Sequence, residues 1–326
     1  MKILVTGAGG FIGSHVTGLL LAAGHDVRAL VHYNGAGSWL NLNSIPHELR
    51  QRLEVRLGDI TDSFFVRDLV VGCDVVLHLA ALIGIPYSYV APASYVATNI
   101  GGTLNILEAC KLAKTSRIVV TSTSEVYGTA QTTPMEESHP LQGQSPYSAS
   151  KIGADKLAES YFLSFDTPVV TLRPFNTYGP RQTARAVIPT IISQALGGAK
   201  SIKLGNLKPR RDLTFVHDTA RAFVLAATVP GIEGETIHFG QGSAHSVAEI
   251  AQLCLDAAGS KAEIVVEEGR LRPERSEVGL LLCNRAKAER LLGWRPAIAL
   301  AEGIAKTTEY MRNQPASANA DGNYQV

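Results

Sequence analysis

A tyrosine and a lysine four positions apart, Tyr147 and Lys151, form the strongest chemical pattern in the sequence. Apolar spacing from Ser148 to Phe165 predicts a helix, so both side chains rise from one face about one turn apart. A tyrosine with its ordinary pKa of about 10 is a poor base, but an adjacent ammonium group and a cationic nicotinamide favour the phenolate. We predict that Tyr147 removes a hydroxyl proton while hydride leaves the same carbon, and that Lys151 holds the nicotinamide ribose.

A run of hydroxyl side chains ending in a carboxylate, Thr121-Ser122-Thr123-Ser124-Glu125, follows the predicted strand Ile118 to Val120. Ligands bind at the carboxyl ends of strands in a parallel α/β sheet, so the run is expected beside the tyrosine and lysine. Ordinary turn chemistry is the alternative interpretation. A simple alcohol dehydrogenase needs no carboxylate here, whereas Glu125 can remove a carbon-bound proton made acidic by a neighbouring ketone.

Three glycines, Gly7, Gly10 and Gly13, stand between the predicted strand Lys2 to Val5 and the predicted helix Ile12 to Ala23. The first permits a tight turn, the second lets the backbone approach a pyrophosphate, and the third permits close packing of the helix. The helix N-terminus supplies amide donors for the anion. A purely structural turn is the alternative, but the strand before and the helix after favour a dinucleotide site. Its predicted residues are Gly7, Gly10, Phe11, Ile12 and Gly13.

The choice between NAD and NADP stays open, with NAD slightly favoured. The usual acidic residue is missing after the second strand, Val27 to Val31, and no arginine follows that could pair with a 2′-phosphate. Asp59 is a candidate to accept from the adenine amino group, or else a turn or helix-capping residue. The remaining predicted cofactor contacts are Ile60, Leu79, Ala80 and Ala81, together with Tyr147 and Lys151.

These residues require a scaffold, and alternating strand and helix patterns predict an α/β fold with a Rossmann-type doubly wound parallel sheet. Beyond Asn176, segments punctuated by proline and glycine predict a smaller C-terminal substrate-binding lobe. We expect a NAD(P)-binding domain over 1–175 and a substrate-binding lobe over 176–313. Residues 213–227 are candidates to return to the first domain, and the polar stretch 314–326 is expected to be a flexible tail.

The bulk properties exclude several classes of protein. The 326 residues carry 30 Lys plus Arg against 29 Asp plus Glu, a formal charge of +1, which gives no general attraction for nucleic acid or anionic membrane. With no apolar segment of signal-peptide or membrane-spanning length, we expect a cytoplasmic protein. The cysteines and histidines lack metal-ligand spacing, so we expect buried free thiols and no bound metal.

Five motifs, TGAGGFIG, HLAA, TSTSEVYG, YSASK and RPFNTYGPRQ, occur in this order along nearly the whole chain. The sequence therefore resembles the extended short-chain dehydrogenase/reductases that act on nucleotide sugars. It is most similar to the NAD(P)-dependent 4,6-dehydratases, particularly those acting on nucleotide-linked N-acetylglucosamine in the legionaminic acid pathway. The segments Tyr33-Asn34 and Ser38-Trp39-Leu40 and the RPFNTYGPRQ run support that branch.

The resemblance implies a reaction cycle. Tyr147, assisted by Thr123, takes the C4 hydroxyl proton as hydride passes to the cofactor, which gives a 4-keto sugar. Glu125 removes the C5 proton, water leaves from C6, and hydride returns to C6, so the tightly bound cofactor ends unchanged. Ser124 stands where dehydratases of the dTDP-glucose type have aspartate and those of the GDP-mannose type have serine, which implies that a relayed water proton assists departure of the hydroxyl.

The resemblance also implies substrate contacts and an assembly. Asn176, Arg211 and Arg272 match positions that contact the substrate diphosphate, although surface salt bridging explains most isolated arginines. The segment Ile83 to Tyr89 is a candidate sugar-side loop. Helices predicted around Ile100 to Leu112 and Ser148 to Phe165 match those that pair across a homodimer.

Three other functions compete with a dehydratase acting on UDP- or GDP-N-acetylglucosamine. A UDP-glucuronate decarboxylase shares the Thr-Ser-Glu run but usually carries a YDEGK-like pair, unlike Tyr147-Ser148-Ala149-Ser150-Lys151. A nucleotide-sugar 4-epimerase needs no carboxylate at Glu125. A non-catalytic NAD(P)-sensing protein would be expected to lose Tyr147, Lys151 or Glu125, all of which are present.

Overall fold

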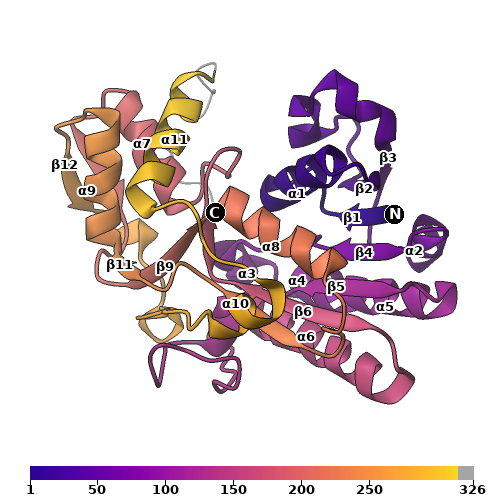
Figure 1. Cartoon of the computed structure of the whole chain (residues 1–326). Coiled ribbons are helices and arrows are strands. Elements are labelled where there is room, and N and C mark those ends of the chain that lie inside the picture. The colour runs from indigo at the N-terminus through magenta and orange to yellow at the C-terminus, as the bar shows by residue number, and fades with distance from the viewer. Residues whose placement is uncertain (315–326) are drawn as a thin grey trace.

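The computed structural model describes residues 1–314, which are organised around a parallel sheet of seven strands (Figure 1). The strand order is β10-β6-β5-β4-β1-β2-β3, and every neighbouring pair is parallel. The strands are β1 (Lys2–Thr6), β2 (Asp26–His32), β3 (Leu53–Gly58), β4 (Val75–His78), β5 (Arg117–Thr121), β6 (Val169–Pro174) and β10 (Thr236–Phe239). The predicted doubly wound α/β sheet is therefore confirmed.

Helices cover both faces of this sheet, which is why its central strands are apolar on both sides. On one face, α1 and α8 pack together, and Val16 and Phe223 join the core beneath them. On the other face α5 contacts both α2 and α6 over a second core. The helices of the main body are α1 (Phe11–Ala22), α2 (Ser63–Val70), α3 (Ile85–Val90), α4 (Pro92–Tyr95), α5 (Gly102–Ala113), α6 (Pro146–Phe165), α8 (Val216–Thr228) and α10 (Ala286–Leu292).

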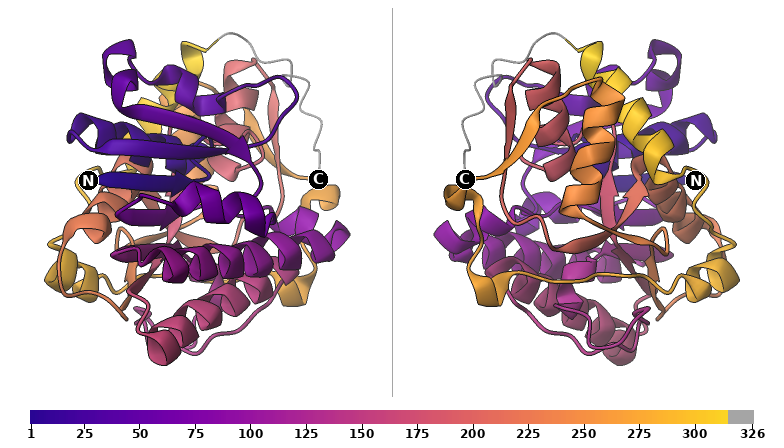
Figure 2. Two further views of the ribbon diagram at one scale, coloured as in Figure 1. Left: turned by 90° about the vertical axis from the view of Figure 1, so that its right-hand side faces the viewer. Right: turned by 90° about the vertical axis from the view of Figure 1, so that its left-hand side faces the viewer.

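A smaller lobe stands beside the sheet, with its helices α9 and α11 facing the viewer in the right-hand view of Figure 2. Three helices pack on one another and on a short sheet over a core of their own. The helices are α7 (Val187–Leu196), α9 (Val247–Ala258) and α11 (Leu300–Arg312). The strands are β7 (Asn176–Tyr178), β9 (Arg210–Phe215) and β11 (Ala244–Ser246) in one sheet and β8 (Ser201–Leu204) and β12 (Glu263–Val266) in another.

The division of the chain at residue 175 stays a prediction, and the structure adds detail to it. Helix α8 lies against α1, and β10 extends the main sheet by pairing with β6. Of the predicted tail, residues 315–326 lie outside the described residues. All four cysteines are buried, as predicted. Within residues 1–314, no helix is both long and apolar enough to cross a membrane.

Candidate active site

The predicted glycine loop is packed so closely that its glycines leave no room for side chains. Gly7 has a positive φ of +68°, and a Cβ there would stand 2.9 Å from the Ala80 amide nitrogen. A Cβ on Gly13 would stand 2.2 Å from the Gly7 carbonyl oxygen. Gly10 is the N-cap of α1, and no side chain caps this helix. Its first amides therefore remain available for an anion such as pyrophosphate.

Thr6, a residue not singled out from sequence, ties this loop to the end of β4. Its hydroxyl oxygen accepts from the amides of Leu79 and Ala80, each at 3.1 Å, and lies 2.9 Å from His78 Nδ1. Because the oxygen already accepts twice, its proton is directed to His78, whose Nε2 then donates to Thr103 at 3.1 Å. Burial lowers the pKa of His78 to about 3, so this imidazole is neutral.

The other predicted cofactor residues differ in how buried they are and in the groups they contact. Phe11 and Ile12 are partly buried at the start of α1, against the core of the smaller lobe. Asp59 accepts from both the amide and the hydroxyl of Thr61, at 2.8 and 2.9 Å, and lies 3.3 Å from His32 Nε2. Ile60 is buried in the core against α5, and Ala81 is half-buried after β4. An adenine contact at Asp59 would therefore share that carboxylate with a local turn.

The predicted catalytic side chains come from α6 and from a 3-10 turn after β5. A capping box between Ser145 and Ser148 starts α6 at Pro146, which places Tyr147 in its first turn. Lys151 Nζ donates to the Thr121 carbonyl oxygen at 2.6 Å. Every residue of the turn at 124–127 is buried, namely Ser124, Glu125, Val126 and Tyr127. Thr123 caps this turn by accepting from the Glu125 amide at 3.2 Å.

Burial opposes charge on both members of the tyrosine and lysine pair. Burial raises the pKa of the Tyr147 phenol, the Thr123 hydroxyl lowers it, and the Glu125 carboxylate raises it again, with a net rise. Burial likewise lowers the pKa of Lys151 to about 8, although the Asp155 carboxylate acts in the opposite direction. Deprotonation of Tyr147 therefore depends on positive charge supplied beside it.

The two predicted diphosphate arginines meet at a carboxylate that the sequence analysis missed. Arg211 Nη2 lies 3.3 Å and Arg272 Nη1 3.6 Å from Glu277 Oε1. Burial lowers the pKa of Arg211, while Glu125 and Glu277 act to raise it. The Glu125 carboxylate therefore affects the pKa of both Arg211 and Tyr147, which indicates that these three side chains lie near one another.

Asn176, the third predicted diphosphate residue, lies on β7 next to the strand that carries Arg211. In that register Asn176 is the partner of Leu213. Its side-chain oxygen Oδ1 is buried and has no hydrogen-bond partner among the described residues. An amide group in this state is suited to a polar ligand.

The segment expected as a sugar-side loop is largely helical, since α3 begins at Ile85, and it is joined to the segment that carries the second arginine. Tyr89 and Ser276 approach through their hydroxyl oxygens at 2.6 Å, and Ser276 donates to the Gln144 carbonyl oxygen at 2.6 Å. Gln144 in turn donates to the Arg275 carbonyl oxygen at 3.1 Å. Tyr95 packs edge-on against the Tyr147 ring, with centroids 6.3 Å apart. Residues 275 and 276 thus contact the main body just before the start of α6.

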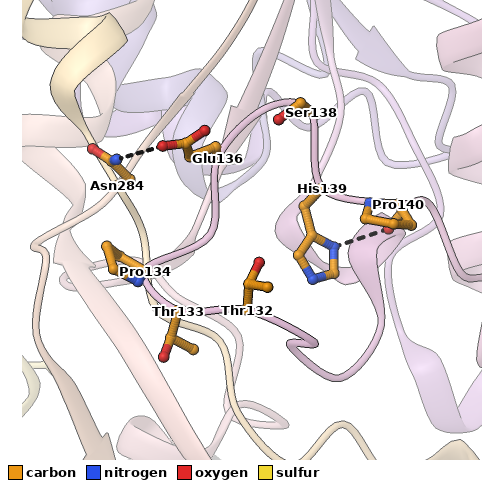
Figure 3. Close-up of a pocket in the computed structure, with 8 residues that line it drawn as sticks. All are labelled: Thr132, Thr133, Pro134, Glu136, Ser138, His139, Pro140 and Asn284. Atoms are coloured by element: carbon orange, nitrogen blue, oxygen red, sulfur yellow. Dashed lines mark hydrogen bonds between the residues drawn. The ribbon is translucent and has the colours of Figure 1, made fainter.

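A pocket of about 400 Å³ lies elsewhere, on the loop between the 3-10 turn and α6 (Figure 3). Asn284 donates to Glu136 at 3.4 Å, and His139 Nδ1 lies 3.0 Å from the Pro140 carbonyl oxygen. The lining residues are Thr132, Thr133, Pro134, Glu136, Ser138, His139, Pro140 and Asn284. Because none of the predicted site residues is among them, the chemistry is assigned from the side chains above and not from this pocket.

The sheet with its amino-terminal glycine loop defines an extended short-chain dehydrogenase/reductase of the nucleotide-sugar dehydratase and epimerase type. Residues 4–307 match the family model described as GDP-mannose 4,6 dehydratase, and the chain belongs to that family. This agrees with the resemblance drawn from the five sequence motifs.

Relatives in the family carry out more than one reaction. A dTDP-glucose 4,6-dehydratase of Actinoplanes sp. is 34% identical over 96% of this chain and 98% of its own length. A UDP-glucose 4-epimerase of Mycolicibacterium smegmatis is 35% identical over 96% of this chain and 99% of its own. A solved dTDP-glucose 4,6-dehydratase of Streptomyces venezuelae, with NAD and TYD bound, superposes with a TM-score of 0.86 at 31% identity, covering 96% of this chain and 97% of the other. Overall similarity therefore does not separate dehydration from epimerisation.

Proposed function

We propose that this protein is a nucleotide-sugar 4,6-dehydratase, with UDP- or GDP-N-acetylglucosamine as the expected substrate. One observation carries the proposal: Glu125 is a buried carboxylate that interacts electrostatically with Tyr147 and with Arg211. Epimerisation at C4 needs a single acid–base group and no second base, whereas dehydration needs a base at C5. The choice of an N-acetylglucosamine substrate rests on the sequence resemblance.

NAD is the proposed cofactor, and NADP is the alternative. The loop fits the pyrophosphate of either, since a Cβ on Gly7 or Gly13 would collide with backbone and the α1 amides are uncapped. The solved dehydratase relative holds NAD. A nicotinamide bound there would supply the acceptor for the C4 hydride and the donor for its return to C6.

The protein side chains then have separate tasks. Tyr147 takes the C4 hydroxyl proton, and the Thr123 hydroxyl favours its phenolate. The Lys151 ammonium, four positions further along the same helix, is expected to favour it as well. Glu125 takes the C5 proton once C4 is a ketone. Ser124 cannot supply a proton as an aspartic acid would, so the departing C6 hydroxyl receives its proton through water. Asn176, Arg211 and Arg272 bind the diphosphate and orient the sugar.

The reaction is tested by product mass. The purified protein is incubated with a panel of nucleotide sugars that includes UDP- and GDP-N-acetylglucosamine, dTDP-glucose, UDP-glucose and UDP-glucuronate. We expect loss of one water from at least one N-acetylglucosamine substrate. A product of unchanged mass would indicate epimerisation, and loss of carbon dioxide would indicate decarboxylation; either alone would overturn the proposal.

The role of Glu125 is tested by Glu125→Gln, which preserves size and removes the base. This variant should form the 4-keto sugar and reduced cofactor and then stall, with little water loss and little exchange of the C5 proton with deuterated solvent. Glu137→Gln is the control, because Glu137 is a partly buried glutamate outside the predicted site, which accepts from the His238 amide at 3.1 Å. Undiminished dehydration and normal C5 exchange in Glu125→Gln would place the base elsewhere.

We also propose a homodimer that pairs α5 and α6 with their copies. These two helices contact each other and lie together on one side of the sheet in Figure 1. Their outer surface leaves Leu112 61% exposed, Leu163 72% and Phe165 53%. Sedimentation should give the mass of a dimer, and Leu163→Lys should shift it toward the monomer. A monomer mass that does not change with concentration would refute this assembly.

A further inference from the structure

A buried cluster of charged side chains lies one helical turn beyond Lys151. Asp155 is 3% exposed, and its Oδ2 accepts from Ser122 Oγ at 2.6 Å and from Arg173 Nε at 3.0 Å. Arg173 also donates to the Tyr127 hydroxyl oxygen at 3.1 Å. The carboxylate is therefore fixed from the sheet by one hydroxyl and one guanidinium, in a place where an unpaired charge would be costly.

The end of β5 holds Lys151 and Asp155 with consecutive residues. The Thr121 carbonyl accepts from Lys151, and the Ser122 hydroxyl donates to Asp155. Side chains four positions apart on a helix lie on the same face, so the ammonium and the carboxylate are neighbours. Asp155 Oδ1 is buried with no hydrogen-bond partner among residues 1–314. This oxygen is free to accept from the ammonium directly or through water.

We propose that Asp155 is a positioning residue for hydride transfer: held by Ser122 and Arg173, it keeps the Lys151 ammonium charged and oriented beside Tyr147. This proposal rests on the proposed function only for the hydride step, which dehydratases and epimerases share. Asp155 would act only through Lys151, and we assign it no contact with the carbon that reacts.

The charges around Lys151 support this role. Burial lowers the pKa of Lys151 to about 8, and Asp155 is the carboxylate that opposes this effect. On β4, His78 is neutral because burial lowers its pKa to about 3. On α6, burial raises the pKa of Tyr147, and on β6 the Arg173 guanidinium adds positive charge behind Asp155. Without Asp155, the ammonium would face burial and a second cation together.

The test is the pH dependence of the first turnover, followed as formation of reduced nicotinamide in Asp155→Asn. The rate should decline at alkaline pH where Lys151 loses its proton, and we call the midpoint of this decline the alkaline inflection. For charges about 6 Å apart at an effective dielectric constant of about 20, loss of the Asp155 charge should lower the inflection by roughly one to two pH units. KM should not change, and Asp155→Glu should restore the inflection. The matched control is Asp218→Asn, since Asp218 is a fully buried carboxylate that accepts from the Ala297 and Ile298 amides. It should lose stability without moving the inflection.

A further measurement keeps the proposal testable if Asp155→Asn folds poorly. A double-mutant cycle of Lys151→Met with Asp155→Asn, read as unfolding free energy without substrate, should show coupling at about pH 7 that disappears at about pH 10.

An unmoved inflection in folded Asp155→Asn, or coupling that is the same at both pH values, overturns the proposal. The product is a separate readout. If the product has the same mass as the substrate while the inflection shifts as expected, dehydration is refuted and the role of Asp155 stands.

Discussion

Replacing Gly13 by alanine tests whether the contact between α1 and the glycine loop determines cofactor binding. The added methyl group would stand 2.2 Å from the Gly7 carbonyl oxygen and 2.9 Å from Ala8 Cα. That carbonyl is held in place because it accepts from the Gly10 amide at 3.0 Å. Restoring an ordinary separation of about 3.5 Å requires α1 to move by roughly 1 Å. Overpacking costs about 1–3 kcal/mol, against the roughly 1 kcal/mol that alanine gains over glycine in a helix.

Gly18 provides the matched control, because it lies in the same helix and an added methyl group meets nothing within 4 Å. We expect Gly18→Ala to raise the free energy of unfolding by about 0.5–1 kcal/mol and to bind NAD like the wild type. Gly13→Ala should lose stability and bind NAD about tenfold or more weakly, since the helix amides move away from the pyrophosphate. Calorimetric titration and thermal unfolding measure both effects. Equal NAD affinities for the two variants would refute the assignment of this loop.

Three further predictions concern catalysis, substrate binding and pH. Tyr147→Phe should keep the fold and the cofactor but form no reduced nicotinamide in single-turnover absorbance; substantial reduction would exclude this tyrosine as the base. Arg211→Met should raise the KM for the nucleotide sugar about tenfold or more by removing a charge-assisted contact, and an unchanged KM would contradict the diphosphate assignment. Burial lowers the pKa of His78 to about 3 and that of His238 to about 4. Below about pH 6.5 these histidines are protonated in the unfolded chain but not in the folded one, so the free energy of unfolding decreases as the pH is lowered. Urea unfolding should show a shallower loss in His238→Gln, and an identical slope would disprove the linkage.

Local patterns were sufficient to place the candidate residues that depend on short spacing. Tyr147 and Lys151 share one face of a single helix, and the glycine loop joins a strand to the helix that follows it. Strand β10 is different: its four residues follow a stretch punctuated by proline and glycine, and its place in the main sheet depends on pairing with β6. No local period carries that information.

Long-range contacts explain the other residues that sequence reasoning missed. Glu277 stands 66 positions from Arg211 in the sequence, so its pairing with that arginine is known only from the folded structure. From the sequence alone, Asp155 is an ordinary polar residue of a helix, and only the structure shows that Ser122 and Arg173 hydrogen-bond to it. Buried polar networks of this kind are assembled by tertiary structure, so composition and periodicity do not reveal them.

Reaction class in this family has to be argued from the short turn after β5. A dehydratase and an epimerase match this chain almost equally, at 34% and 35% identity, because both need the same sheet, cofactor loop and acid–base pair. Dehydration adds two chemical requirements, a base for the C5 proton and a source of the proton that leaves with the C6 hydroxyl as water. In this chain a carboxylate stands in that turn, where Thr123 accepts from the Glu125 amide and burial limits access of water to the side chain. Under the proposed function, we expect replacement of Glu125 to abolish dehydration while leaving the fold, and most of the sequence identity, intact.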